Sequence, residues 1–219
     1  MNSAVLAIET SHSQGSVALR TETEILFERS FVSGKSRNSD LFPVLEDALQ
    51  VLSGIQLSDI LVGTGPGSFN GTRVAIALAQ AIGLARHCPA VGLSSFLALP
   101  SVREKAEVAV IGDARRATFY LQHAVSGRLR GETLLLKREE LQDQLAKLSC
   151  PLVTNDDCQR MDFIAELSGE APSANLLAAA WFEMSKAQQD VHRAKTLEPA
   201  YLRPPHIGKA KPRVPLTRN

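Results

Sequence analysis

The sequence lacks the residue patterns of several protein classes. It has three cysteines, Cys88, Cys150 and Cys158, which are too few, odd in number and widely spaced for a secreted disulfide framework or a zinc site. Its five histidines are scattered singly, so no H-E-x-x-H pair forms. A G-x-S-x-G elbow is absent because Pro66 stands where Ser68 would need its first glycine. These absences disfavour a disulfide-stapled domain, a metallopeptidase and a serine hydrolase.

The chain also lacks an excess charge and a long hydrophobic run. Among 219 residues there are 24 Lys and Arg against 23 Asp and Glu, a net charge of +1, so no global field draws it to nucleic acid or a membrane. The longest uncharged stretch, residues 74–85, would span about 18 Å as a helix, against about 30 Å for a bilayer core. No basic flank precedes the first apolar run. We therefore expect a cytoplasmic protein with no membrane segment.

The order of the expected elements repeats once along the chain. Apolar runs and turn residues predict strands, then a helix capped by Ser39 with Pro43 in its first turn and ended by Gly54, then a strand and an Ala-rich helix from near Thr72. The expected strands of the first half are 4–8, 16–19, 25–32 and 59–63. A short strand at 91–92 and a helix at 96–99, ended or kinked by Pro100, link the halves. The second half predicts strands at 107–111, 118–124, 130–136 and 152–154, and helices at 138–148, 161–167 and 175–186. Each half is therefore predicted to have the element order βββαβα.

This doubled order indicates an α/β fold class. Two βββαβα lobes facing each other across a cleft resemble the actin-like ATPase superfold of sugar kinases, Hsp70 and actin, which holds nucleotide between its lobes. We predict an N-terminal lobe at 1–98 that carries the partner-binding helices, a C-terminal lobe at 99–203, and a basic Pro-containing tail at 204–219. No acid follows Glu198, so this end of the chain either contacts nucleic-acid phosphates or is solvated.

A glycine-rich loop joins the strand at 59–63 to the Ala-rich helix. Its backbone N–H groups could cradle an anion, with Arg73 neutralising a phosphate. It is no P-loop, since no Lys follows the glycines, and Asn70 replaces the last glycine of a G-x-G-x-x-G. A tight turn that lets the helix pack closely is an equal alternative. The candidate phosphate or nucleotide contacts are Gly65, Gly67, Ser68 and Gly71.

The first strand of each expected lobe ends at an acidic residue. Glu9 and Asp113 would face the cleft, where such acids hold Mg and orient the nucleophile in phosphotransferases. The alternative is that both are solvated or capping acids.

The helix at 74–85 is apolar on nearly every face and must be covered all round. The cover is either another helix of the same lobe or, as we predict, another molecule. The candidate interface residues are Leu41, Leu45, Arg73, Ile76, Ala77, Ala79, Gln80 and Gly83. For the free chain, monomer and homodimer remain alternatives.

Five segments together resemble one family over nearly the whole chain. They are A-V-L-A-I-E-T-S at 4–11, G-P-G-S-F-N-G-T-R at 65–73, G-L-S-S at 92–95, D-A-R at 113–115 and E-P-A-Y-L-R at 198–203. In this order they resemble the TsaB (YeaZ) family of bacterial tRNA threonylcarbamoyladenosine biosynthesis subunits.

The resemblance implies an actin-like subunit with no catalytic residues or metal ligands of its own. Its partner would be TsaD, the catalytic subunit that holds the metal and transfers threonylcarbamoyl to N6 of adenosine 37 of tRNA. TsaE, an ATPase, would bind across this heterodimer, and the chain would contact tRNA only as part of the complex. If ATP or ADP with Mg binds at all, the resemblance places it at the interface of the complex. The family usually has Asp where Glu9 stands, Thr where Asn70 stands and a His within the segment 37–40. These departures weaken any intrinsic nucleotide or metal chemistry.

The alternative function is a free-standing, sugar-kinase-like ATP phosphotransferase. It would use Glu9, Asp113 and the glycine-rich loop, but the sequence shows no convincing catalytic base beyond Asp113.

Overall fold

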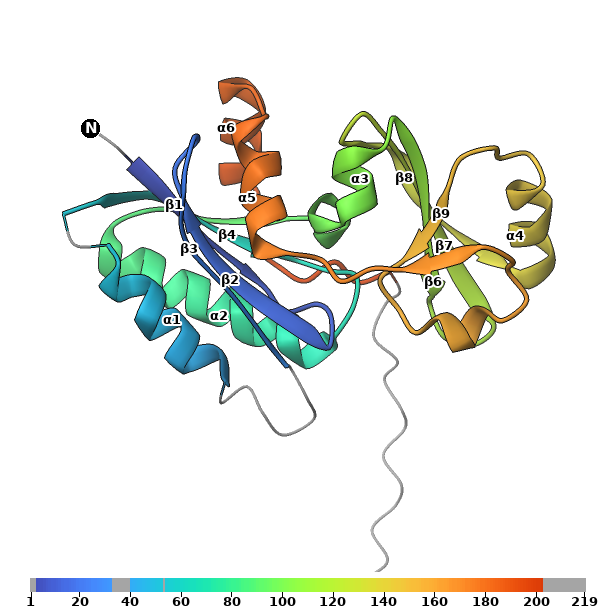
Figure 1. Ribbon diagram of the computed structural model, residues 1–219, viewed down its shortest axis with the longest axis horizontal. Coiled ribbons are helices and arrows are strands. Elements are labelled where there is room, and N and C mark those ends of the chain that lie inside the picture. Colours follow the sequence, from blue (N-terminus) through green and yellow to red (C-terminus); the bar gives the residue numbers. More distant parts are fainter. Residues whose placement is uncertain (1–2, 33–39, 53, 203–219) are drawn as a thin grey trace, which may run out of the picture.

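The computed structural model describes residues 3–32, 40–52 and 54–202, which form two lobes, each built on a five-stranded mixed sheet (Figure 1). The first sheet has the order β3-β2-β1-β4-β5 and the second the order β10-β9-β6-β7-β8. In both, the first three strands form an antiparallel meander and the later strands join in parallel. The predicted fold class, an α/β protein of the actin-like ATPase superfold, is confirmed.

The first sheet is centred on a strand that is buried from Ala4 to Glu9. It consists of β1 (Ser3–Glu9), β2 (Gln14–Arg20), β3 (Ile25–Val32), β4 (Gln56–Gly63) and β5 (Ala90–Leu93). In β1, Leu6 and Ile8 point into one hydrophobic cluster, whereas Val5 and Ala7 point into another. Because successive strand residues face opposite sides, a continuous apolar run of this kind requires cover on both faces of the sheet.

Helices supply that cover from two parts of the chain. On one face lie α1 (Leu41–Gln50) and α2 (Phe69–Arg86) (Figure 1). On the other face lies α5 (Ala174–Phe182), whose Trp181 is 1% exposed, while α6 (Lys186–Arg193) contacts β5. Although these two helices follow the second sheet in sequence, they pack on the first. Residues 174–193 were expected in the C-terminal lobe at 99–203, but they pack on the sheet of the first lobe.

The second lobe repeats the first with less helix. It consists of β6 (Glu107–Asp113), β7 (Thr118–Val125), β8 (Arg128–Lys137), α4 (Arg138–Leu145), β9 (Leu152–Thr154), the 3-10 helix η3 (Cys158–Met161) and β10 (Leu167–Gly169). The helix predicted at 161–167 is wrong. Met161 and Ile164, spaced like one helical turn, both pack into the core of this lobe, and one turn is all that forms before β10 begins.

The single helix predicted at 175–186 is also wrong in its extent. The chain leaves the helical path after Phe182, and the Ser185 side chain caps α6 by accepting a hydrogen bond from the Gln188 N–H. The capping box formed by Ser185 and Gln188 starts this second helix.

The connection between the lobes is itself buried. It comprises the 3-10 helix η2 (Ser95–Ala98) and α3 (Pro100–Glu104), in which Pro100 begins a helix instead of ending one. Phe96 and Leu99 pack into the same hydrophobic cluster as Val108 and Tyr120 of the second lobe. The core is thus continuous across the junction.

Some predictions fall on residues that the structure does not describe. The Ser39 cap lies outside the described residues, and so does the tail at 204–219; α1 begins at Leu41 with Asp40 at its N-cap position. Within the described part of the chain, no helix combines the length and the apolar character needed to cross a membrane.

Candidate functional site

A cavity of about 800 Å³ lies between the two lobes. The loops that follow β1, β4, β6 and β9 line it, together with residues 200–202. The carboxyl ends of the parallel strands of α/β sheets are the usual place for a ligand site. The site expected from the doubled order therefore exists as a cavity, and its chemistry depends on the side chains that reach it.

The glycine-rich loop uses much of its hydrogen-bonding capacity within the chain. The Gly65 N–H donates to Ser95 Oγ at 3.0 Å, the Ser68 N–H donates to the Ser11 carbonyl at 2.6 Å, and the Gly71 N–H donates to Ser68 Oγ at 3.2 Å. A Cβ at Gly71 would lie 2.3 Å from the carbonyl oxygen of Thr10. Of the two interpretations of this loop, these contacts support the tight turn that lets α2 approach the end of β1.

The loop still contributes to the wall of the cavity. Gly67 and Ser68 line it, whereas Gly65 and Gly71 do not. Ser68 is also the N-cap residue of α2, whose first residue, Phe69, lies three residues before the helix start that we predicted near Thr72.

Glu9 does not reach the cavity, contrary to expectation. Its side chain is 0% exposed, and a Cβ at Gly63 would lie 1.8 Å from its Oε2, which places the carboxyl beneath β4. Oε1 accepts a hydrogen bond from the Ser11 N–H at 2.7 Å, and Oε2 has no hydrogen-bond partner within the described residues. Burial raises the pKa of this carboxyl, although the neighbouring groups of Ser11 and Ser95 partly oppose the shift.

Asp113 does line the cavity, but arginine side chains already bind its carboxylate. Its carboxylate accepts hydrogen bonds from the Arg115 N–H at 2.7 Å and from Arg115 Nη1 at 2.9 Å. Arg160 Nη1 lies 3.9 Å from the same carboxylate and 3.4 Å from Asp156. On the opposite side, burial lowers the pKa of His12 while the charge of Asp156 raises it. Asp113 and Asp156 are thus already paired with cations, whereas Asp157, a third acid of the lining, accepts a hydrogen bond from the Gln159 N–H.

These residues do not fit the Mg-nucleotide that an actin-like fold implies. Of the two acids expected to bind the metal, Glu9 is sealed beneath the sheet and Asp113 is neutralised by Arg115. The part of the chain that the structure describes contains no group of three His, Cys, Asp or Glu side chains arranged to hold a metal ion. Mg requires several well-placed oxygen ligands, so the cavity is poorly suited to it.

Instead, polar residues brace the two lobes across the cavity. The Tyr120 hydroxyl donates to Asn155 Oδ1 at 2.5 Å, and Asn155 Nδ2 donates to the Pro66 carbonyl of the first lobe at 3.1 Å. Burial raises the pKa of Tyr120, so its hydroxyl stays a hydrogen-bond donor. Sequence reasoning missed Asn155, because an Asn after a short strand carries no signal for a partner 89 residues away.

The Ala-rich helix is covered on one side only. Thr72, Ala75, Ile76, Ala79 and Gly83 form its buried side. The opposite side, including Arg73, Ala77, Gln80 and Leu84, is exposed.

The interface candidates therefore need correction. Five of the candidates are buried in the first lobe, because α1 and α2 use them to pack on their own sheet: Leu41, Leu45, Ile76, Ala79 and Gly83. Arg73, Ala77 and Gln80 remain open to a partner.

A groove runs between α1 and α2 on the outside of the lobe. It has a volume of about 520 Å³ and is lined by Phe42, Leu45, Glu46, Leu49, Gln50, Leu78, Ile82 and Arg86. Phe42 is 53% exposed. Leu84, which is 81% exposed, lines a separate hollow with Gln80 and Ala90. We call the groove and the exposed side of α2 formed by Ala77, Gln80 and Leu84 the docking face.

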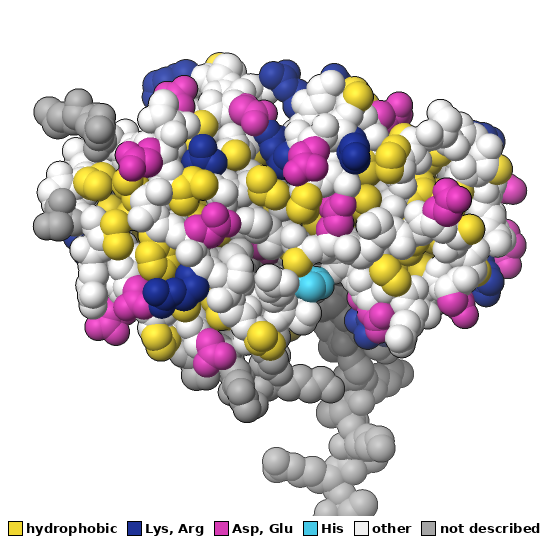
Figure 2. All heavy atoms as spheres, in the orientation of Figure 1, with side chains coloured by type: hydrophobic (Ala, Val, Ile, Leu, Met, Phe, Trp, Pro, Cys, Tyr) yellow, Lys and Arg dark blue, Asp and Glu magenta, His cyan; other side chains and the backbone are white. Residues whose placement is uncertain are grey.

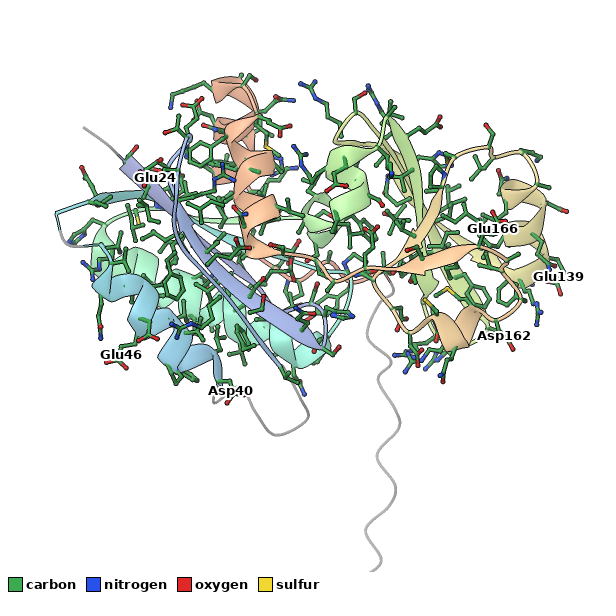
Figure 3. All side chains as sticks on the ribbon, in the orientation of Figure 1. Glu24, Asp40, Glu46, Glu139, Asp162 and Glu166 are labelled. Carbon is green, nitrogen blue, oxygen red and sulfur yellow. The ribbon has the colours of Figure 1, made fainter. Side chains whose placement is uncertain are left out.

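The docking face mixes apolar and charged groups. Figure 2 shows hydrophobic side chains exposed among acidic and basic ones on the side of the molecule that it draws. Glu46 extends from the outer side of α1, away from the sheet (Figure 3). An apolar surface rimmed by such charges is typical of a protein interaction site.

Comparison with known proteins gives consistent matches. Residues 32–198 match the family model described as "TsaD: tRNA N6-adenosine threonylcarbamoyltransferase". The chain is 30% identical over 164 residues to the tRNA threonylcarbamoyladenosine biosynthesis protein TsaB of Escherichia coli (strain K12), covering 68% of this chain and 69% of that protein. It is 28% identical to the protein of the same name from Buchnera aphidicola, covering 68% and 75%. Among solved structures, YeaZ from Pseudomonas aeruginosa is similar, with a TM-score of 0.68, 26% identity, and coverage of 91% of this chain and 100% of that chain.

Proposed function

We propose that this chain, which belongs to the TsaB (YeaZ) family, takes part in tRNA threonylcarbamoyladenosine biosynthesis as a non-catalytic subunit that binds TsaD. The observation that carries this proposal is the docking face. TsaE and tRNA would then join through the assembled complex, in the cytoplasm where such a complex would meet its tRNA.

The burial pattern of α2 supports a protein partner. Ala77, Gln80 and Leu84 lie on the side of the helix that the first sheet leaves open. Small residues such as Ala77 let a second helix approach closely, while Phe42 and Leu84 offer large side chains to a partner's pockets. A helix pair from another protein, laid across the groove, would bury these groups.

The cavity between the lobes supports a non-catalytic role. Catalytic phosphoryl transfer needs a metal held next to the phosphates and an acid free to orient the nucleophile. Here Glu9 is inaccessible and Asp113 is paired with Arg115. Among the residues that the structure describes, the sugar-kinase-like alternative therefore has no supporting arrangement, and an assay of ATP hydrolysis by the isolated chain checks it directly.

The experiment is a pairing assay between purified TsaD and variants of this chain. Leu84→Arg places a charge in the docking face, and we expect it to weaken pairing at least about tenfold, since an unpaired buried charge costs several kcal/mol. The matched control is Val191→Arg, because Val191 is also an exposed apolar residue, 57% exposed, but lies on α6, which is not part of the docking face. Equal pairing by both variants would contradict the proposal.

The same experiment distinguishes the other occupant of this face. If the free chain forms a homodimer through the docking face, Leu84→Arg will convert it to a monomer in light scattering, and TsaD will compete with self-association. A dimer that survives Leu84→Arg uses another surface.

A further inference from the structure

The chain passes between the two lobes more than once. The first passage is the buried junction of η2 and α3, and the second leads from β10 back to α5. The third is the segment 197–202, in which Leu197 packs on the core of the first lobe and Leu202 on the cluster shared by the junction and the second lobe. Within this segment, the ring centroid of Tyr201 lies 5.7 Å from that of Phe69 on α2. Lobes linked at several points have little freedom to turn about one hinge.

On the cavity side, Asn155 connects the second lobe to the first. Its Nδ2 donates to the Pro66 carbonyl at 3.1 Å, and its Oδ1 accepts a hydrogen bond from the Tyr120 hydroxyl. Asn155 is 6% exposed, so breaking the bond to Pro66 would leave a buried donor without a partner. A rotation of the lobes that widens the cavity separates Asn155 from Pro66 and therefore breaks this bond.

Away from the cavity, Arg103 of α3 makes a second connection between the lobes. Its Nη1 donates at 2.9 Å to the carbonyl of Gly127, in the turn between β7 and β8 of the second lobe. Its Nη2 forms an ion pair with Glu183, at the end of α5, which packs on the first sheet. Figure 1 shows α3 between α5 and the second sheet. The Arg103 side chain is 7% exposed, so the loss of these contacts would leave a buried cation unpaired.

The two connections lie near opposite ends of β7. Tyr120, the partner of Asn155, lies near the start of this strand, and Gly127 follows its end. At about 3.3 Å per residue, these two residues are about 20 Å apart. The buried junction packs against β7 at Tyr120 and Ala124, between the two connections. A rotation about the junction that widens the cavity therefore strains the Asn155 connection, and one that narrows the cavity strains the Arg103 connection.

We infer that Asn155 and Arg103 are two clamps that hold the lobes at one angle, each blocking one direction of a hinge rotation. The cavity of about 800 Å³ then keeps one width in the free chain. Hinge closure around a ligand is a common response of two-lobed proteins, and here it would have to break a buried contact. The inference concerns the isolated chain and does not rest on pairing with TsaD.

The test measures the distance between two spin labels across the cavity by double electron–electron resonance, in the full chain. Ser13→Cys and Gln159→Cys carry the labels, in a chain that also has Cys88→Ser, Cys150→Ser and Cys158→Ser. Ser13 and Gln159 are exposed; Ser13 lines the cavity from the first lobe, and Gln159 lies on η3 in the second. We expect this labelled reference chain to give one narrow distance distribution.

Breaking the two clamps should shift the distances in opposite directions. Asn155→Leu, which removes the bond to Pro66 but keeps a side chain of similar size, should add longer distances. Arg103→Met, which keeps the apolar stem, should add shorter ones, and the double variant should show both. The matched control is Thr133→Val. It removes the hydrogen bond from Thr133 Oγ1 to Gln122 Oε1, 2.7 Å long, which lies within the second lobe, so the distribution should stay that of the reference chain.

Two milder variants keep the test decisive if the first ones fail to fold. Asn155→Asp retains the acceptor for the Tyr120 hydroxyl but loses the donor to Pro66, and should also add longer distances. Glu183→Gln removes the ion pair at a side chain that is 63% exposed and leaves Arg103 in place, and should also add shorter distances.

Two results would overturn the inference. One is a reference distribution as broad as that of the double variant, because the lobes would then rotate with both clamps intact. The other is a distribution for the Asn155 and Arg103 variants that matches Thr133→Val, because the buried junction alone would then set the angle. Neither result affects the pairing assay with TsaD, so the proposed function stands or fails separately.

Discussion

The buried carboxyl of Glu9 should make the stability of this protein fall as the pH rises. The side chain is fully buried at the end of β1, and desolvation is the largest cause of its raised pKa. In the unfolded chain the same group ionises near its ordinary value of 4.5. The folded state therefore holds a proton that the unfolded state has already lost.

The sign and size of the effect follow from proton linkage. Below about pH 4.5 both states are protonated, and the contribution of Glu9 to stability is fully present. As the pH rises from there to the raised pKa of the folded state, this contribution is lost at a rate approaching about 1.4 kcal/mol per pH unit. Glu9→Gln keeps the acceptor for the Ser11 N–H but does not titrate, so its stability lacks this slope.

The assay is urea unfolding, followed by circular dichroism at several pH values between 4.5 and 8. The difference in the free energy of unfolding between Glu9→Gln and wild type should shift in favour of the variant with rising pH, since the other titrating groups are common to both. Glu24→Gln, which removes a carboxyl from the exposed surface, controls for the change in net charge (Figure 3). Parallel pH profiles for Glu9→Gln and wild type would refute the reasoning.

Two further predictions concern packing and charge. Gly71→Ala should lower the free energy of unfolding by about 1–3 kcal/mol, because the new methyl group would lie 2.3 Å from the Thr10 carbonyl oxygen. Chemical denaturation measures this change. An unchanged stability would show that α2 can shift to make room, against the prediction. Arg193→Met should lower the free energy of unfolding by about 3 kcal/mol, because it leaves Asp59, which is 1% exposed, without the cation that lies 2.7 Å away. Lys186→Met, on the same helix, should change it by no more than about 0.5 kcal/mol, because the Lys186 side chain is exposed. Similar melting temperatures for these two variants would contradict the importance assigned to the buried pair.

Part of the cavity could be found from the sequence. Both candidate acids end the first strand of a lobe, as predicted, because a strand that stops at a polar residue is a local signal. The sequence could not show that Glu9 turns beneath Gly63 or that Arg160 reaches toward Asp113, because both depend on how distant segments meet. The Asn155 brace and the Phe69–Tyr201 pair were missed for the same reason.

Most of the order of strands and helices was determined by the sequence itself, since apolar runs, turn residues and caps act over a few neighbouring positions, although β10 and the break between α5 and α6 were missed. An Ala-rich helix was also evident, but its periodicity could not say which side faces outward, because nearly all of its sides are apolar. Only tertiary packing decided that Ala79 lies inside and Ala77 outside, and that residues 174–193 return to cover the first sheet. These outcomes depend on contacts between residues far apart in the chain, where the free energy of burying surface outweighs any local preference.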